Sequence, residues 1–293
     1  MAPNIPESSA RFLAHFHEHG WVRLRGAFDA EAARGMRDSV WRALGDAGIH
    51  RDQPSTWTVQ RPPRLQHLKN DPVFQRIGSP TLLSAIDAIL DGARYERPRS
   101  WGAFFLAFPG STPWGIPTSG WHIDAYYASS LSPVRGVKTF ALFGDVAPRG
   151  GGTLMVSGSH RLAYTWFREN PPPPGARSAE MRRLLRKHPY VRDLHSPGDD
   201  EERSERFMRH VEDVDGIRLQ VAEAAGDAGD VILVHPLVLH VAAPNNAAEP
   251  RFMVSGGVTT DMWGWRPITE ISAMRGLQAS DLKRTSTRCT RQP

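Results

Sequence analysis

The pattern of apolar and polar positions divides the chain into a helical first third and a later part built from short strands. The clearest helix covers residues 30–44, where apolar residues recur every three or four positions and Asp29 is a candidate N-cap. The same periodicity predicts a helix at 10–19 that Gly20 ends. The remaining elements predicted in this part are a short strand at 21–24 and a helix at 80–90.

From residue 101 the pattern changes to short apolar or alternating runs separated by turn residues, which is typical of a sandwich or barrel. Eight strands are predicted, at 101–108, 120–124, 137–146, 153–156, 217–222, 230–235, 239–242 and 251–259. Eight antiparallel strands in two facing sheets form a jelly roll, which can enclose a small-molecule site at its mouth. We therefore predict a mainly β fold with flanking helices (α+β), in which residues 1–100 pack against the outside of one sheet.

The domain organisation follows from the same pattern. A single catalytic domain is predicted over 1–275, with its jelly-roll core in 101–163 and 217–260 and a basic, flexible tail at 276–293. The segment 164–216 interrupts the core and contains four consecutive prolines and a charged stretch. Because loops of this length are usually lids or disordered, we expect a lid-like insertion there.

Composition narrows the class of protein. The formal charge of +5 depends on four basic residues among the last twelve positions, so the rest of the chain carries only +1 and offers no extended basic face for nucleic acid. The single cysteine, Cys289, excludes an internal disulfide and indicates a reducing compartment. Neither a membrane-length apolar run nor a secretory signal is recognisable, so we expect a cytoplasmic protein with a small-molecule substrate and no nucleic-acid or membrane partner. Oligomeric state is not predicted.

Two motifs carry the candidate chemistry. His122 and Asp124 lie two positions apart in the predicted strand 120–124, so their side chains share one face. A third ligand on a distant strand would complete a two-histidine, one-carboxylate set, which leaves three positions on iron for a bidentate 2-oxo acid and dioxygen. His235 and His240 both qualify, and Pro236 between them prevents a choice by strand parity.

Arg251 follows His240 by eleven positions, at the start of the predicted strand 251–259. Its guanidinium can form a two-pronged pair with the far carboxylate of 2-oxoglutarate, which a lysine could not reproduce.

Three separated motifs, in this order, resemble the phytanoyl-CoA dioxygenase family: W-H-I-D at 121–124, G-G-G-T-L-M-V-S-G-S-H at 150–160 and G-D-V-I-L-V-H-P-L-V-L-H-V-A-A-P-N at 229–245. The resemblance covers about 101–259 and includes the spacing from His240 to Arg251. It implies a double-stranded β-helix (cupin-like) fold and selects His240 over His235 as the third ligand. It also implies Fe(II), 2-oxoglutarate and O2 as cofactor and co-substrates, with succinate and CO2 as products. Halogenases of the family have a small residue in place of the carboxylate, so Asp124 disfavours halogenation.

We therefore expect an Fe(II)- and 2-oxoglutarate-dependent dioxygenase that hydroxylates or otherwise oxidises an unactivated carbon of a small organic molecule. The expected metal-binding and catalytic residues are His122, Asp124 and His240, and Arg251 is the expected anchor of 2-oxoglutarate. Lys138 and Thr153 are further candidates for contact with 2-oxoglutarate. Candidate substrate residues, chosen because they lie near the expected barrel mouth, are Trp57, Arg64, Phe104, Tyr126 and Tyr127. For Phe104, ordinary core packing is an equal alternative.

Other readings remain beside this one. A metal-dependent cupin-type isomerase or hydrolase would keep the histidine and aspartate ligands without needing Arg251, and a non-catalytic family member would need none of them. His160 lies in a Gly-Ser-His turn, where a structural role is favoured over metal binding. The histidines at 15, 17 and 19 alternate along a helix and so point in different directions, which favours a solvated helix over a metal tract.

Overall fold

The computed structural model describes residues 7–58, 65–124, 131–173, 176 and 178–260, which belong to one compact unit, Met1–Asp261. The predicted tail at 276–293 and the predicted domain end at 275 lie outside these residues. The longer helices are α1 (Glu7–His19), α2 (Ala30–Gly45), α4 (Pro80–Ile89), α5 (Ser159–Glu169) and α6 (Ser178–Leu185). The shorter helical elements are η1 (Pro54–Thr56), η2 (Gln66–Asn70), α3 (Pro72–Gln75), α7 (Pro189–Leu194), α8 (Asp200–Ser204) and η3 (Glu205–Arg209).

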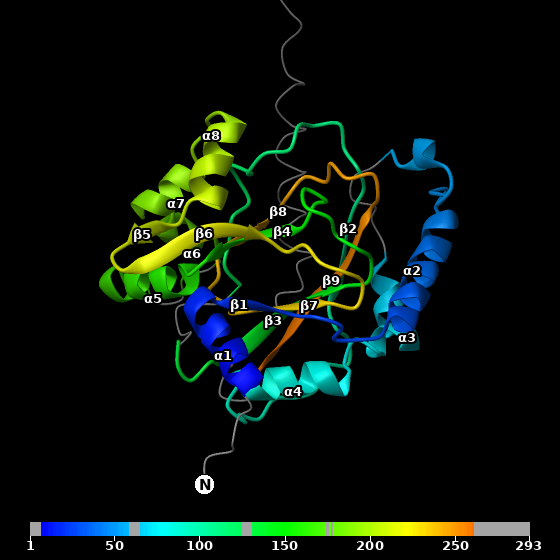
Figure 1. Cartoon of the computed structure of the whole chain (residues 1–293), viewed down its shortest axis with the longest axis horizontal. Coiled ribbons are helices and arrows are strands. Elements are labelled where there is room, and N and C mark those ends of the chain that lie inside the picture. Colours follow the sequence, from blue (N-terminus) through cyan, green and yellow to red (C-terminus); the bar gives the residue numbers. More distant parts are fainter. Residues whose placement is uncertain (1–6, 59–64, 125–130, 174–175, 177, 261–293) are drawn as a thin grey trace, which may run out of the picture. The chain divides into compact units, whose positions relative to one another are not determined.

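Two antiparallel sheets form the core (Figure 1). The strands are β1 (Trp21–Leu24), β2 (Ala103–Ala107), β3 (Gly136–Leu142), β4 (Thr153–Ser157), β5 (Glu212–Val214), β6 (Ile217–Glu223), β7 (Val231–Val234), β8 (His240–Ala242) and β9 (Arg251–Thr259). One sheet has the order β1-β7-β3-β9-β2 and the other the order β5-β6-β4-β8. The predicted jelly roll, a cupin-like double-stranded β-helix with flanking helices, is confirmed.

The five-stranded sheet is apolar on both faces, and each face packs against a different partner. Val137, Ala141 and Val254 join one large buried cluster with residues of α2 and α4, so this face lies under the helices. Phe140 and Met253 alternate with them and pack with Met155 of β4, from the other sheet. Because side chains alternate along a strand, each residue of β3 and β9 can be assigned to the helical side or to the barrel interior.

Helices α2 and α4 begin where the sequence supplies a capping side chain. Asp29 accepts a hydrogen bond from Ala32 N at 2.7 Å at the start of α2, and Ser79 accepts one from Leu82 N at 3.1 Å at the start of α4. Both helices therefore begin at the predicted residue, and each ends within one residue of its predicted end.

The strand predicted at 120–124 is wrong, because the segment pairs with the sheet at a single position. His122 forms an isolated bridge with His240, and Gly120 has a φ of 85°, a conformation that ends regular pairing on that side. The strand predicted at 137–146 ends at Leu142, where the chain turns away through Gly144. The strand predicted at 251–259 is confirmed residue for residue.

Segment 164–216 contains the end of α5, helices α6 to α8, η3 and β5, and Figure 1 shows α6, α7 and α8 gathered beside β5 and β6. The segment has a buried apolar set of its own, consisting of Phe167, Met181, Leu185, Tyr190, Val191, Leu194 and Phe207. It returns to the core through the β5–β6 hairpin, whose Asp215 and Gly216 both have positive φ. None of the described helices has the length and apolarity needed to span a membrane.

Candidate metal centre

His122, Asp124 and His240 converge at one point, although the first and the last are 118 positions apart in the sequence. Their nearest ligand atoms all lie within 4.8 Å of one another. His122 Nε2 lies 3.8 Å from Asp124 Oδ1, and His240 Nε2 lies 3.6 Å from Asp124 Oδ2. Two imidazoles and one carboxylate at this separation can bind a single divalent metal ion.

The edge of the four-stranded sheet holds the two parts of this cluster together. His122 and His240 exchange both main-chain hydrogen bonds, at 3.0 and 2.9 Å, and Asp124 N donates to Pro236 O at 3.0 Å. Directly paired residues in an antiparallel bridge carry their side chains on the same side. The imidazole rings of the two histidines accordingly lie with their centroids 4.2 Å apart.

Main-chain carbonyls orient both imidazoles. His122 Nδ1 lies 2.8 Å from Gly120 O, and His240 Nδ1 lies 2.9 Å from Val238 O. A carbonyl oxygen only accepts, so each neutral ring donates from Nδ1 and presents an unprotonated Nε2. This is the tautomer that a metal ligand requires, and the second-nitrogen hydrogen bond is usual for metal-binding histidines. The donor set therefore fits a divalent metal.

Lys138 contributes a positive charge beside the carboxylate. Its Nζ lies 2.5 Å from Asp124 Oδ2, reaching it from β3. Burial by itself raises the pKa of Asp124, but the charge of Lys138 and the two imidazoles outweigh it and hold the pKa below its usual range. Burial, with His122 beside it, lowers the pKa of His240 to about 3. Asp124 is thus a carboxylate and His240 a neutral imidazole at neutral pH.

One side of the cluster is open. The His122 and Asp124 side chains keep 30% and 21% of their surface exposed, whereas that of His240 keeps 5%. A small molecule can therefore reach the cluster from the side of His122 and Asp124, while the barrel encloses the other side.

Arg251 is almost completely buried at the start of β9. It lies two positions before Met253 in β9, so its side chain faces the barrel interior as that of Met253 does. Its Nη1 donates to Gly151 O in the turn before β4. Gly151 has a φ of 79°, and a Cβ there would lie 2.9 Å from the Cβ of Asn245, so only glycine fits. The Gly-Gly-Gly motif is thus a strand-entry turn against the arginine.

Lys138 and Thr153 also face the barrel interior. Lys138 lies two positions before Phe140 in β3, and Thr153 lies two positions before Met155 in β4. Residues two positions apart in a strand carry their side chains on the same face. Thr153 pairs with Ala242, two residues beyond His240 along β8. The structure therefore brings both residues to the interior face that carries His240 and Arg251.

The candidate substrate residues lie elsewhere or outside the described residues. Phe104 lies on the helical side of β2, where its ring contacts Phe74 edge-on at 4.7 Å between centroids. Trp57 packs against Phe108 at 5.4 Å in the same cluster, and its Nε1 donates to a main-chain carbonyl. Both side chains fill the core between helices and sheet, because alternation in β2 places Phe104 on that face. Arg64, Tyr126 and Tyr127 lie outside the described residues.

The other histidines do not join the cluster. His235, the rival third ligand, is buried beside His160 with its Nδ1 accepting from Leu237 N at 3.1 Å. His160 Nε2 donates to His17 O at 3.0 Å, which ties the start of α5 to α1. Among the described residues, His122, Asp124 and His240 are the one group with metal-binding geometry.

Sequence reasoning missed Glu223, which organises the turn against Arg251. Its carboxylate accepts from Arg149 N at 2.8 Å and from Gly152 N at 3.0 Å. Burial raises the pKa of Glu223, while these two amides and the charge of Arg251 act in the opposite direction. No local signal marks Glu223, because its partners lie more than seventy residues away in sequence.

The model of the phytanoyl-CoA dioxygenase (PhyH) family matches residues 16–253. Among solved structures, the non-heme α-ketoglutarate-dependent epimerase SnoN from nogalamycin biosynthesis is 16% identical with a TM-score of 0.52, over 98% of this chain and 94% of that one. Its complex with Fe3+, α-ketoglutarate and nogalamycin RO is 17% identical with a TM-score of 0.50, over the same shares. EvdMO1 is 16% identical with a TM-score of 0.51, over 86% of this chain and 50% of that one. At these identities the structures show a shared fold. No protein with a curated description matches significantly.

Proposed function

Since the chain belongs to the phytanoyl-CoA dioxygenase family and is a 2-oxoglutarate-dependent oxygenase, we propose that it oxidises an unactivated carbon of a small organic molecule. The proposed reaction is a hydroxylation or a related oxidation that releases succinate and CO2. Its cofactor is Fe(II), and its co-substrates are 2-oxoglutarate and O2.

The convergence of His122, Asp124 and His240 is the observation that carries the proposal. We assign these three residues as the iron ligands, because both Nε2 atoms and the carboxylate face one point while both Nδ1 atoms are held by carbonyls. An iron ion held by these three residues would supply the oxygen activation. The protein contributes by fixing the three donors and by leaving the solvent side open to the substrate.

We assign Arg251 as the anchor of the far carboxylate of 2-oxoglutarate. Its guanidinium is buried, faces the barrel interior and is steadied by Gly151 O, so it is oriented before the co-substrate arrives. Thr153 and Lys138 face the same interior, and we propose that both contact 2-oxoglutarate. Lys138 also holds the Asp124 carboxylate through its ion pair, which limits the rotation of that ligand.

The test is 2-oxoglutarate turnover with Fe(II) in air, measured as O2 uptake and succinate and CO2 release over a panel of small organic molecules. We expect succinate to form without a panel compound at a low rate and faster with an accepted substrate. His122→Ala should abolish Ni(II) binding and succinate formation together, whereas His210→Ala, at an exposed histidine of the insertion, should change neither.

The rival functions give different results. Turnover with Zn(II) in the absence of O2 would favour a cupin-type isomerase or hydrolase. A protein that binds neither Ni(II) nor 2-oxoglutarate would be a non-catalytic family member, and the proposal would be wrong.

A further inference from the structure

We propose that Arg203, in the helical insertion, is a positioning residue that braces the segment leading into His122 and Asp124, so that the insertion sets the geometry of the metal centre. The inference rests on the proposed function only in taking His122 and Asp124 as metal ligands.

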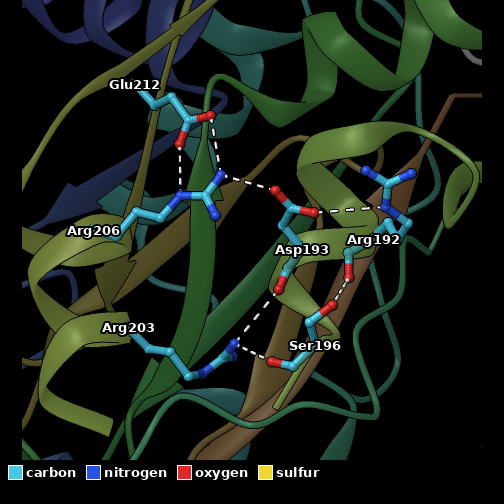
Figure 2. Close-up of polar contacts among 6 residues, drawn as sticks. All are labelled: Arg192, Asp193, Ser196, Arg203, Arg206 and Glu212. Atoms are coloured by element: carbon cyan, nitrogen blue, oxygen red, sulfur yellow. Dashed lines mark hydrogen bonds and ion pairs between the residues drawn. The ribbon is translucent and has the colours of Figure 1, made fainter. Parts of the chain in front are cut away.

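Arg203 lies in α8 and is only 7% exposed. Its guanidinium donates to four main-chain carbonyls, and Figure 2 shows two of these contacts, to Asp193 and Ser196. The other two contacts are to Leu194 O at 3.0 Å and to Ile116 O at 3.3 Å. Three of the four acceptors lie at the end of α7 or just beyond it, and the fourth, Ile116, precedes the metal-binding segment.

Burying a guanidinium is costly unless its donors are satisfied. The carbonyls at the end of α7 have no partners within the helix, so they suit a cation that lies next to them. Arg203 therefore meets most of its hydrogen-bonding needs inside the insertion, and the same planar group extends one donor to Ile116. Because the guanidinium is rigid and planar, its hydrogen bonds to the carbonyls near the end of α7 also fix the position of the donor that binds Ile116 O.

A short series of contacts continues from Ile116 to the metal centre. Ile116 is buried, and the next residue, Pro117, accepts a hydrogen bond from Trp121 Nε1 at 2.7 Å. Trp121 is buried and directly precedes His122, whose Nδ1 is held by Gly120 O. Any displacement of Ile116 would thus be passed to the carbonyl and the chain that orient the His122 ring.

The insertion approaches this loop at a second point. A Cβ on Gly115 would lie 2.2 Å from Asp200 Oδ1, so α8 packs directly against the residue before Ile116. Arg203 and Asp200 lie on the same short helix. The loop is therefore held by both packing and hydrogen bonding from one element.

Arg206 supplies a matched control. It lies one turn beyond Arg203 and also contacts Asp193, but through the side-chain carboxylate at 3.1 Å, as Figure 2 shows. Its other partner is Glu212, and both arginines lie over the ring of Phe207, at 5.5 Å for Arg203 and 4.7 Å for Arg206. Arg206 is 45% exposed, and within the described part of the chain its ion pairs go to Asp193 and Glu212, both in the insertion. Its loss therefore perturbs the insertion without removing the hydrogen bond to Ile116.

The experiment compares Arg203→Met, Arg203→Lys and Arg206→Met with the wild-type full chain, each stripped of metal. Ni(II) alone is titrated calorimetrically, and hydrogen exchange is followed in peptides covering 113–124. We expect Arg203→Met to weaken Ni(II) binding about tenfold, the lower end of the range for residues that support metal ligands. Exchange in 113–124 should rise in this variant and remain unchanged in Arg206→Met.

Arg203→Lys keeps the inference testable if Arg203→Met fails to fold. A lysine can still reach carbonyls at the end of α7 but lacks the fork that also reaches Ile116, so it should fold and still show faster exchange in 113–124. A role in stability alone would lower Tm without changing Ni(II) affinity or local exchange, and that result in a folded Arg203 variant would overturn the inference. Failure of the wild-type chain to bind Ni(II) would instead refute the proposed function.

Discussion

His160 is predicted to make the stability of the protein depend on pH. The residue is buried at the start of α5, with its Nε2 donating to His17 O at 3.0 Å. Burial lowers its pKa from 6.5 to about 4. In the unfolded chain the imidazole takes up a proton near pH 6.5, whereas in the folded protein it remains neutral until about pH 4. The free energy of unfolding therefore decreases as the pH falls from 6.5 to 4. Above pH 6.5 His160 has no effect on it.

The size of the effect follows from the shift. One pKa unit corresponds to about 1.4 kcal/mol, so protonation of His160 lowers the free energy of unfolding by about 3 kcal/mol across the whole window. About 2 kcal/mol of this is lost between pH 8 and pH 5. Urea unfolding of the metal-free protein at several pH values measures this loss. In His160→Gln the amide can still donate to His17 O, but no titrating group remains, so the dependence on pH should be shallower by about 2 kcal/mol over that range.

The difference between the two proteins isolates His160, because the other histidines with lowered pKa, His15, His188, His195 and His240, are present in both. If the two stability curves run parallel from pH 8 to pH 5, then burial of His160 does not depress its pKa and the reasoning is wrong.

Three further predictions concern the metal centre and the sheet that supports it. Arg251→Lys should retain Ni(II) binding but weaken 2-oxoglutarate binding by at least tenfold, measured by anaerobic calorimetry, because the two-pronged pair is lost; unchanged affinity would remove Arg251 from the co-substrate site. His240→Gln should abolish Ni(II) binding while His235→Gln preserves it, and the reverse outcome would show that the ligand is His235. Asp230→Ala should lower the free energy of unfolding by about 3–5 kcal/mol in urea, because the buried carboxylate accepts from Arg23 Nε at 2.6 Å and from two main-chain amides; a loss below about 1 kcal/mol would contradict this.

Local patterns determined most of the elements. The period of β9 and the capping residues of α2 and α4 are properties of contiguous sequence, and the structure has these elements within a residue of the prediction. Asp215-Gly216 is a further local signal, because this dipeptide favours the positive φ values of the hairpin turn between β5 and β6. The insertion could have been predicted as packed helices from its own apolar spacing.

The three residues of the candidate metal centre could also be predicted from motifs, His122 and Asp124 from their spacing and His240 from the family resemblance. Their convergence depends on pairing between distant segments, which the tertiary structure alone supplies. The alternation in segment 120–124 predicts a strand, but the segment pairs with β8 only at His122, and Gly120 has a positive φ. It is therefore not a strand.

Sequence alone did not fix which face a side chain takes or which distant group it meets. The run Ala-Phe-Phe-Leu-Ala in β2 is apolar on both faces, so only the packed helices show that Phe104 lies away from the metal centre. The contacts of Lys138 with Asp124 and of Arg203 with Ile116 join residues 14 and 87 positions apart. Periodicity reports the environment along one segment, whereas these contacts depend on how the segments fold against one another.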